Sequence, residues 1–187
     1  LPLVGIFIVI VWWGGGLLGS WQYRQEVLGA VAVGWLVLLG AVARQQVGYW
    51  KDSETLFRRA LAVTTDNFVM HHNLGNELER QGRLAEAVAE HGRAVALRPF
   101  SAESHYSLAN ALYRQGQYEA AVTSYWQAIR FRPDYVAAHN NLGVAYHALG
   151  RRAEAIQQYR VALRLDPADA RARQNLQDIL AEEGSAP

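Results

Sequence analysis

The side chains best suited to chemistry in this 187-residue chain are its six histidines, and three of them recur at an interval of 34 residues. The recurring residues are His71, His105 and His139. Imidazole binds zinc and transfers protons near neutral pH. One zinc ion, however, needs all its ligands within about 2.1 Å, whereas equivalent helices in a stack are separated by roughly 8–10 Å or more. We therefore interpret these histidines as aromatic core residues and predict no metal site.

The sequence offers no other catalytic arrangement. His139 and His147 could share a helix face, but no carboxylate or cysteine completes a metal site with them. No metalloprotease helix motif, nucleotide-binding glycine loop or serine nucleophile elbow is present. The net charge of +1 gives no electrostatic reason to expect nucleic-acid binding. We predict that this chain is not an enzyme and has no catalytic residue, metal or cofactor.

A second set of polar residues recurs at the same interval and suits peptide binding. Asn73, Asn141 and Asn175 occupy one position of the period, and Ser107 interrupts the series in the middle. A carboxamide both donates and accepts hydrogen bonds, so a row of them can pair with a peptide backbone without reading its side chains. The alternative is that each asparagine bonds only locally.

These polar residues are positioned by a repeat of 34 residues that glycines and prolines mark. The marking residues are Gly48, Gly82, Gly116 and Gly150, and Pro99, Pro133 and Pro167. Between them, apolar residues follow the spacing of one helix face, first on one helix and then on another. Glycine can end the first helix in the left-handed conformation, and proline cannot continue the second. A period of this length predicts an all-α helix-turn-helix solenoid, whose usual role is binding.

The sequence of these repeats resembles the tetratricopeptide-repeat family. The segments NLGNELERQGRLAEAVAEHGRAVALRP and NNLGVAYHALGRRAEAIQQYRVALRLDP follow the family consensus nearly from end to end. Histidine replaces the usual tryptophan at the fourth position of each repeat. The resemblance implies a half repeat at 48–67, whole repeats at 68–101, 102–135 and 136–169, a capping helix at 170–183 and a tail at 184–187.

In this family the first helix of each repeat lines a concave groove. The resemblance implies that the groove here is formed by Asn73, Asn76, Arg80, Tyr106, Asn110, Tyr113, Arg114, Asn141 and Asn175. Tyrosine supplies flat contact area with a polar tip, and Arg80 and Arg114 would form a short basic stripe. Family members that clamp chaperone tails rely on groove lysines, and the only lysine here, Lys51, precedes the whole repeats. We therefore expect a peptide or protein segment of another class.

The first 47 residues differ in composition and predict a membrane region. Residues 1–23 carry no charge, and residues 27–43 form a second uncharged run of 17 residues. Because a membrane span needs about 20 mostly apolar residues, in a range of about 17–25, we predict two transmembrane helices, at about 1–19 and 27–47, in contact with the lipid bilayer. The alternatives are helices buried in a water-soluble fold and a signal peptide, and the lack of a basic leader argues against the second.

The order of two spans followed by repeats is similar to the C-terminal end of the transmembrane tetratricopeptide-repeat O-mannosyltransferases. The junction RQQVGYWKDSETLFRRALAVTTDN carries this resemblance. It implies that the chain is the C-terminal module of a larger membrane glycosyltransferase-like protein, whose catalytic acidic residues lie in an early loop with no counterpart here. In that family the repeats face the lumen or periplasm, whereas the basic residues after the second span lean weakly toward a cytoplasmic side. We expect an integral protein of a bacterial inner membrane, with a periplasmic solenoid.

Two hypotheses for the function are compatible with this organisation. In the first, the repeats bind an extended acceptor polypeptide and present it to a parent transferase. In the second, the chain is a non-enzymatic membrane adaptor that docks a partner during complex assembly or secretion. Further spans upstream, with an acidic pair in the first large loop, would favour the first hypothesis.

Overall fold

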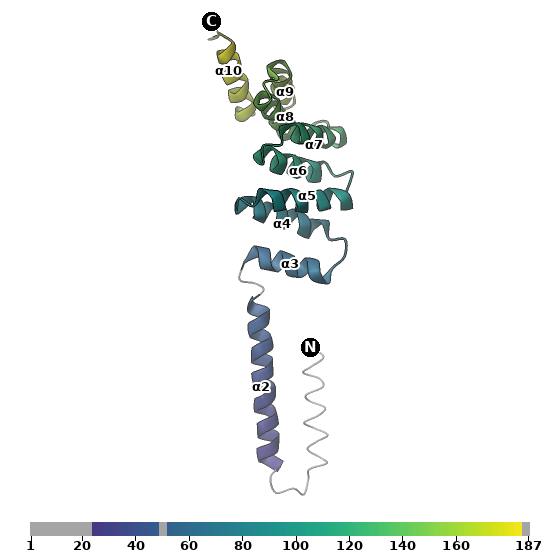
Figure 1. Cartoon of the computed structure of the whole chain (residues 1–187), viewed down its shortest axis with the longest axis vertical. Helices are drawn as coiled ribbons and strands as arrows, with labels where there is room; N and C mark the ends of the chain where they lie inside the picture. Colours follow the sequence, from purple (N-terminus) through teal and green to yellow (C-terminus); the bar gives the residue numbers. More distant parts are fainter. Residues whose placement is uncertain (1–23, 49–51, 185–187) are drawn as a thin grey trace. The chain divides into compact units, whose positions relative to one another are not determined.

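The computed structural model describes residues 24–48 and 52–184, which belong to two compact units, residues 1–51 and 52–187. Within these described ranges the secondary structure consists of nine α-helices, α2 to α10 (Figure 1). The all-α solenoid part of the predicted fold is therefore confirmed.

The first unit contains one described helix, α2 (Arg24–Gly48). None of the helices in the described ranges is both long enough and apolar enough to cross a membrane. The prediction of two transmembrane helices is therefore wrong, and so is the predicted location of the chain as an integral protein of a bacterial inner membrane.

Two charges within α2 limit the apolar length of the span predicted at 27–47. Glu26 and Arg44 bound an uncharged stretch of 17 residues. At a rise of about 1.5 Å per residue this stretch reaches about 25 Å, which is at the lower limit of the length that can cross a hydrocarbon core of about 30 Å. The other predicted span, at about 1–19, lies outside the described residues.

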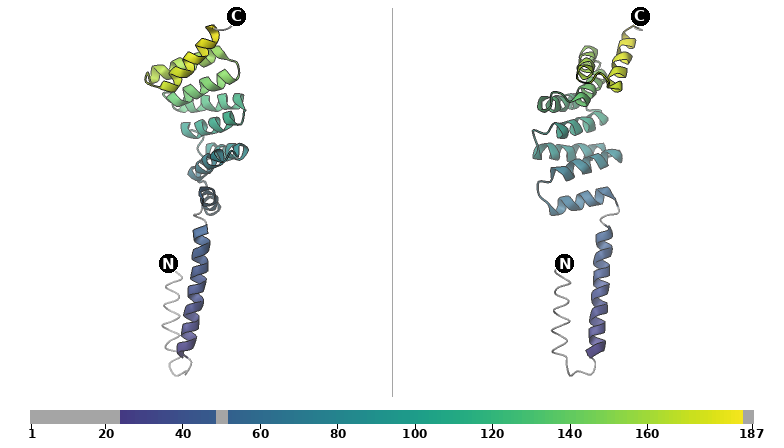
Figure 2. Two further views of the ribbon diagram at one scale, coloured as in Figure 1. Left: turned by 90° about the vertical axis from the view of Figure 1, so that its left-hand side faces the viewer. Right: turned by 180° about the vertical axis from the view of Figure 1, so that it is seen from behind.

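The second unit is a stack of helix pairs (Figures 1 and 2). Its first helices are α4 (Phe68–Arg80), α6 (Ala102–Arg114), α8 (Val136–Ala148) and α10 (Ala170–Gly184). Its second helices are α3 (Ser53–Val63), α5 (Leu84–Leu97), α7 (Tyr118–Phe131) and α9 (Arg152–Leu165). Each helix packs against the next, and α4, α6 and α8 also touch in succession. The first helices thus form one continuous face of the stack.

The first helices end in a common turn, which sets the angle between the two helices of a pair. Gly82, Gly116 and Gly150 have φ values of 77°, 84° and 72°, in the left-handed region that glycine tolerates best. The next N–H then bonds back into the helix, as Arg83 N donates to Leu78 O at 2.9 Å. The same bond recurs in the two following repeats at 2.9 Å. This arrangement is a Schellman motif and confirms the role predicted for the three glycines.

The core depends on small residues of the first helices that face rings on the second helices. Gly75 faces the imidazole of His91, and Gly143 faces the ring of Tyr159. A Cβ atom added to either glycine would lie 2.6 Å or 2.5 Å from the ring. Both rings are buried, with 0% and 1% exposure, so neither can move aside without disturbing its neighbours.

We expect Gly143→Ala to destabilise the solenoid. The new methyl group would overlap the Tyr159 ring, and overpacking of this kind costs about 1–3 kcal/mol. Gly92→Ala is the matched control, because a Cβ there meets nothing within 4 Å and a helical glycine replaced by alanine gains about 0.5–1 kcal/mol. Urea unfolding followed by circular dichroism measures both variants. Equal stability of the two would contradict the account of the core.

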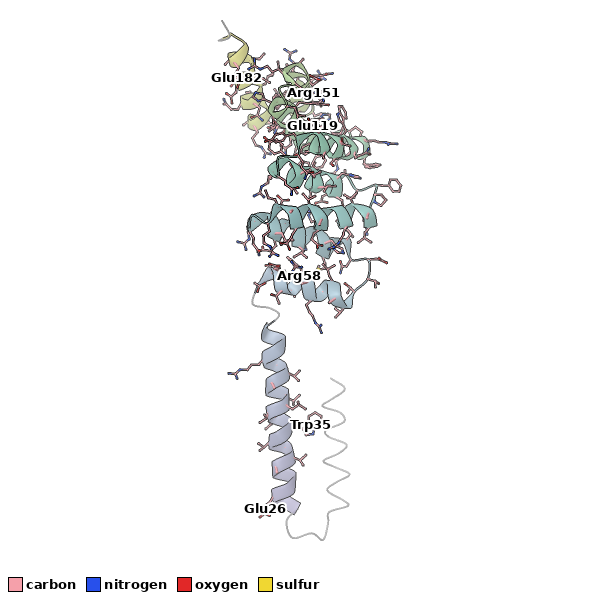
Figure 3. All side chains as sticks on the ribbon, in the orientation of Figure 1. Glu26, Trp35, Arg58, Glu119, Arg151 and Glu182 are labelled. Carbon is pink, nitrogen blue, oxygen red and sulfur yellow. The ribbon has the colours of Figure 1, made fainter. Side chains whose placement is uncertain are left out.

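Through Glu54, acid should weaken both the helix α3 and its attachment to the stack. This carboxylate accepts hydrogen bonds from Arg58 (labelled in Figure 3) at 2.8 Å and from Arg83 at 2.8 Å. These bonds, with Arg58 the larger effect, lower the pKa of Glu54 from 4.5 to about 2. A lowered pKa means that folding favours the charged form, so the stabilisation is present above pH 4.5 and is lost as the pH falls toward about 2.

We therefore expect the difference in melting temperature between the wild type and Glu54→Gln to shrink as the pH falls through that window. Thermal melts at a series of pH values measure it. Glu103→Gln is the control, because Glu103 makes no hydrogen bond or ion pair with any described residue. A difference for Glu54→Gln that stays constant with pH would show that its ion pairs contribute nothing.

Candidate functional site

A cavity of about 300 Å³ opens on the face formed by the first helices. Its wall is made by residues of α4, α6, α7 and α8, namely Glu79, Asn110, Tyr113, Arg114, Tyr125, Asn141 and Val144. We call this the central cavity. Four of these residues, Asn110, Tyr113, Arg114 and Asn141, were predicted from the sequence as groove residues, and the fold brings them together.

The carboxamide of Asn110 is fixed by hydrogen bonds at the wall of the central cavity. Its Oδ1 accepts from Tyr125 Oη at 2.6 Å and from Asn141 Nδ2 at 3.0 Å. Burial raises the pKa of the Tyr125 hydroxyl, so this hydroxyl stays protonated and donates. Because two donors occupy Oδ1, the amide orientation is set before any ligand arrives. Within the described part of the chain, Asn110 Nδ2 has no hydrogen-bond partner.

The other asparagines continue this arrangement along the stack. Asn141 Nδ2 also donates to Tyr106 Oη at 3.0 Å, and Asn141 Oδ1 accepts from Asn140 Nδ2 at 3.2 Å. Asn175 of α10 donates to Asn140 Oδ1 at 2.9 Å. Hydrogen bonds therefore connect α6, α8 and α10, and much of the capacity expected to serve a peptide is used between repeats. The predicted residues Tyr106 and Asn175 belong to this chain of hydrogen bonds.

The two arginines predicted to form a short basic stripe are paired with glutamates. Arg114 Nη1 donates to Glu79 Oε2 at 2.8 Å, and its Nη2 donates to the Glu79 carbonyl at 3.2 Å. Arg80 Nη2 donates to Glu77 Oε1 at 2.6 Å. Each guanidinium therefore faces a carboxylate, so the stripe presents no unopposed positive charge.

Glu79 is held from two sides. Besides the bond from Arg114, its Oε1 lies 3.0 Å from Nε2 of His91, whose side chain is fully buried. Although burial raises the pKa of Glu79, the hydrogen bonds from His91 and Arg114 outweigh it and lower that pKa below 4.5. Glu79 is therefore a carboxylate at neutral pH, and it carries a fixed negative charge at the edge of the central cavity.

The remaining predicted residues lie at the N-terminal end of the stack. Asn73, Asn76 and Arg80 line a second cavity of about 290 Å³, together with Ser53, Phe57 and Glu77. Asn76 Nδ2 lies 3.1 Å from His72 Nε2. The nine predicted residues thus divide into two groups instead of one uniform row.

The three recurring histidines connect helices and loops. His105 Nε2 lies 2.8 Å from the Pro99 carbonyl oxygen, and His139 Nε2 lies 3.1 Å from that of Pro133. His71 Nδ1 lies 2.7 Å from Glu90 Oε2 on the second helix of its repeat. Each is therefore more than an aromatic filler, because its ring bonds a neighbouring element. Among the described residues, no group of three potential ligands could hold a metal ion.

Sequence reasoning missed two residues that organise the site. Tyr125 is absent from the predicted groove residues, yet its hydroxyl reaches Asn110 in the cavity wall. Asn140 was not considered, although it joins Asn141 to Asn175 and is only 5% exposed. The available signal was the pair of adjacent asparagines at 140–141, since a buried carboxamide needs partners.

Models of one repeat family match the solenoid. The model described as TPR repeat matches residues 75–116 and 109–150, and the model described as tetratricopeptide repeat matches residues 136–169. Together they cover residues 75–169, slightly more than half of the 187 residues.

Two curated relatives match part of the chain. Protein O-mannosyl-transferase TMTC4 of Homo sapiens is 32% identical over 88 residues, which are 47% of this chain and 12% of that protein. The protein of the same name from Mus musculus is 31% identical over 88 residues. The chain therefore spans about one eighth of the length of these relatives, because the matched residues make up 12% of each relative.

Solved structures share the fold. The crystal structure of MamA has a TM-score of 0.68 at 23% identity, covering 76% of this chain and 83% of that one. The second TPR domain of human RPAP3, in complex with the HSP70 peptide SGPTIEEVD, has a TM-score of 0.57 at 26% identity, covering 61% and 98%. The helix pairs, the recurring turn glycines and the family matches lead to one conclusion. The chain belongs to the tetratricopeptide-repeat family.

Proposed function

We propose that this chain is a scaffold that binds an extended peptide or protein segment along the face of its first helices. The observation that carries the proposal is the central cavity, whose wall holds the Asn110 carboxamide with its Oδ1 occupied and its Nδ2 unpaired among the described residues. A main-chain carbonyl is the simplest ligand group for that donor. The solenoid is not expected to catalyse a reaction.

Preorganisation of Asn110 is the physical advantage of this site. Tyr125 and Asn141 hold Oδ1 in place, so a ligand need not order the amide when it binds. Tyr113 and Val144 supply neighbouring apolar surface for a side chain of the bound segment. Binding of the HSP70 peptide SGPTIEEVD by the similar RPAP3 domain supports a peptide as the class of ligand.

The match to the human O-mannosyl-transferase favours a more specific setting. In that setting the solenoid is one module of a larger glycosyltransferase-like protein and presents an acceptor polypeptide to the catalytic part. The match covers 12% of that protein, so the proposal rests on the repeat region of this chain alone. The full coding sequence tests it. An acidic pair in an early loop would support a transferase, and a complete reading frame without one would favour the adaptor.

We expect Asn110→Ala to weaken binding of peptides selected from a random display library on the wild-type chain. Loss of one neutral hydrogen bond, worth about 0.5–1.5 kcal/mol, corresponds to a loss of affinity of up to about tenfold. Fluorescence polarisation with labelled peptides measures the affinity. Gln157→Ala, at an exposed position of α9, is the control and should bind as the wild type does.

A second variant separates ligand binding from folding. Asn110→Asp keeps an acceptor for Tyr125 and Asn141 but removes the Nδ2 donor, so it should lose affinity while retaining the helical signal in circular dichroism. Wild-type affinity in both Asn110 variants would place the peptide elsewhere and overturn the proposed site.

A further inference from the structure

The central cavity contains a built-in ion pair that bears on the charge of its ligand. Among the lining residues, Glu79 and Arg114 carry opposite charges, and the others are asparagine, tyrosine and valine. Arg114 lies 2.8 Å from the Glu79 carboxylate and also donates to the Glu79 carbonyl. The two charges therefore cancel within the wall.

Glu79 cannot easily release Arg114 to a ligand. Its other carboxylate oxygen lies 3.0 Å from the fully buried His91, which anchors the carboxylate to the core. The side chain of Glu79 is only 14% exposed, whereas that of Arg114 is 48% exposed. A ligand carboxylate approaching Arg114 would have to compete with a charge-assisted hydrogen bond that is already formed.

We propose that the Glu79–Arg114 pair acts as a charge filter, so that the central cavity selects uncharged residues of the bound segment. This inference rests on the proposed peptide-binding function and names the ligand class. Asn110 Nδ2 is available for a backbone carbonyl, while Tyr113, Tyr125 and Val144 line the space that a neutral side chain would occupy. Arg114 is already paired and is not free for an acidic residue, and Glu79 is already paired and is not free for a basic one, so a charged residue would lose its hydration without gaining a partner.

The second cavity of the same face follows a similar rule. Its lining charges are Arg80 and Glu77, and their side chains are joined by two hydrogen bonds of 3.0 Å and 2.6 Å. Both cavities along the first helices thus carry an arginine that a glutamate of the same face has already neutralised. The ligand that fits this face differs in charge from the peptide SGPTIEEVD, which the similar RPAP3 domain binds.

Selection from a random peptide display library on the full chain tests the filter without assuming a ligand sequence. Peptides selected on the wild type should contain Asp and Glu, and also Lys and Arg, less often than the starting library does. Glu79→Gln keeps an acceptor for His91 but frees Arg114, so its selected peptides should become acidic. The affinity of a matched peptide with Glu in place of Gln should then rise about tenfold or more.

Two further variants complete the design. Arg114→Gln leaves the negative charge of Glu79 without its arginine partner, so this variant should select basic peptides. It provides a second test of the charge filter if Glu79→Gln fails to fold. Glu154→Gln is the control, because it removes an equal charge from an ion pair outside the central cavity, in which Arg151 Nε lies 2.9 Å from Glu154 Oε1. This variant should select the same peptides as the wild type does.

The outcomes separate this inference from the function on which it rests. Enrichment of acidic peptides on the wild type, or no change of charge in both the Glu79 and Arg114 variants, would overturn the filter but leave peptide binding standing. No enrichment on the wild type over the bare support would overturn both.

Discussion

The close approach of a first helix to the ring of a second helix is the constraint on which the solenoid depends. Gly75 and Gly143 each lack the Cβ that would lie within 2.6 Å of a buried ring. This approach fixes the pairing of α4 with α5 and of α8 with α9, so that stacking of the pairs aligns the first helices on one face. The site is a consequence of that alignment, since its residues come from three successive first helices and one second helix.

The same geometry couples the core to the site. The ring of Tyr125 fills the interior of the middle repeat with 2% exposure, while its hydroxyl bonds Asn110 in the cavity wall. In the preceding repeat the buried ring of His91 has the same role, because its Nε2 is hydrogen-bonded to the Glu79 carboxylate. Tyr125 and His91 occupy the same position in successive repeats. The choice of tyrosine or histidine at that position therefore decides which polar group of the binding face is hydrogen-bonded to the core.

The sequence predicted the parts of this structure that depend on periodicity. Recurring glycines and apolar spacing indicated helix pairs, because left-handed turns and helix faces are local properties. It did not predict the pairing of Arg114 with Glu79 or the bonds from Asn140 to Asn141 and Asn175, because these join residues of different helices and depend on side-chain geometry. The hydropathy of α2 also led to a wrong prediction, because its uncharged run suggested a membrane span that the structure does not support.

A crystal structure of the chain with a peptide selected on the wild type tests the central claim most directly. The account predicts an extended peptide on the first helices, with one of its carbonyl oxygens about 2.9 Å from Asn110 Nδ2. The Glu79–Arg114 pair should remain intact beside an uncharged residue of the peptide. A peptide bound on the second helices, or a ligand carboxylate that displaces Glu79 from Arg114, would contradict it.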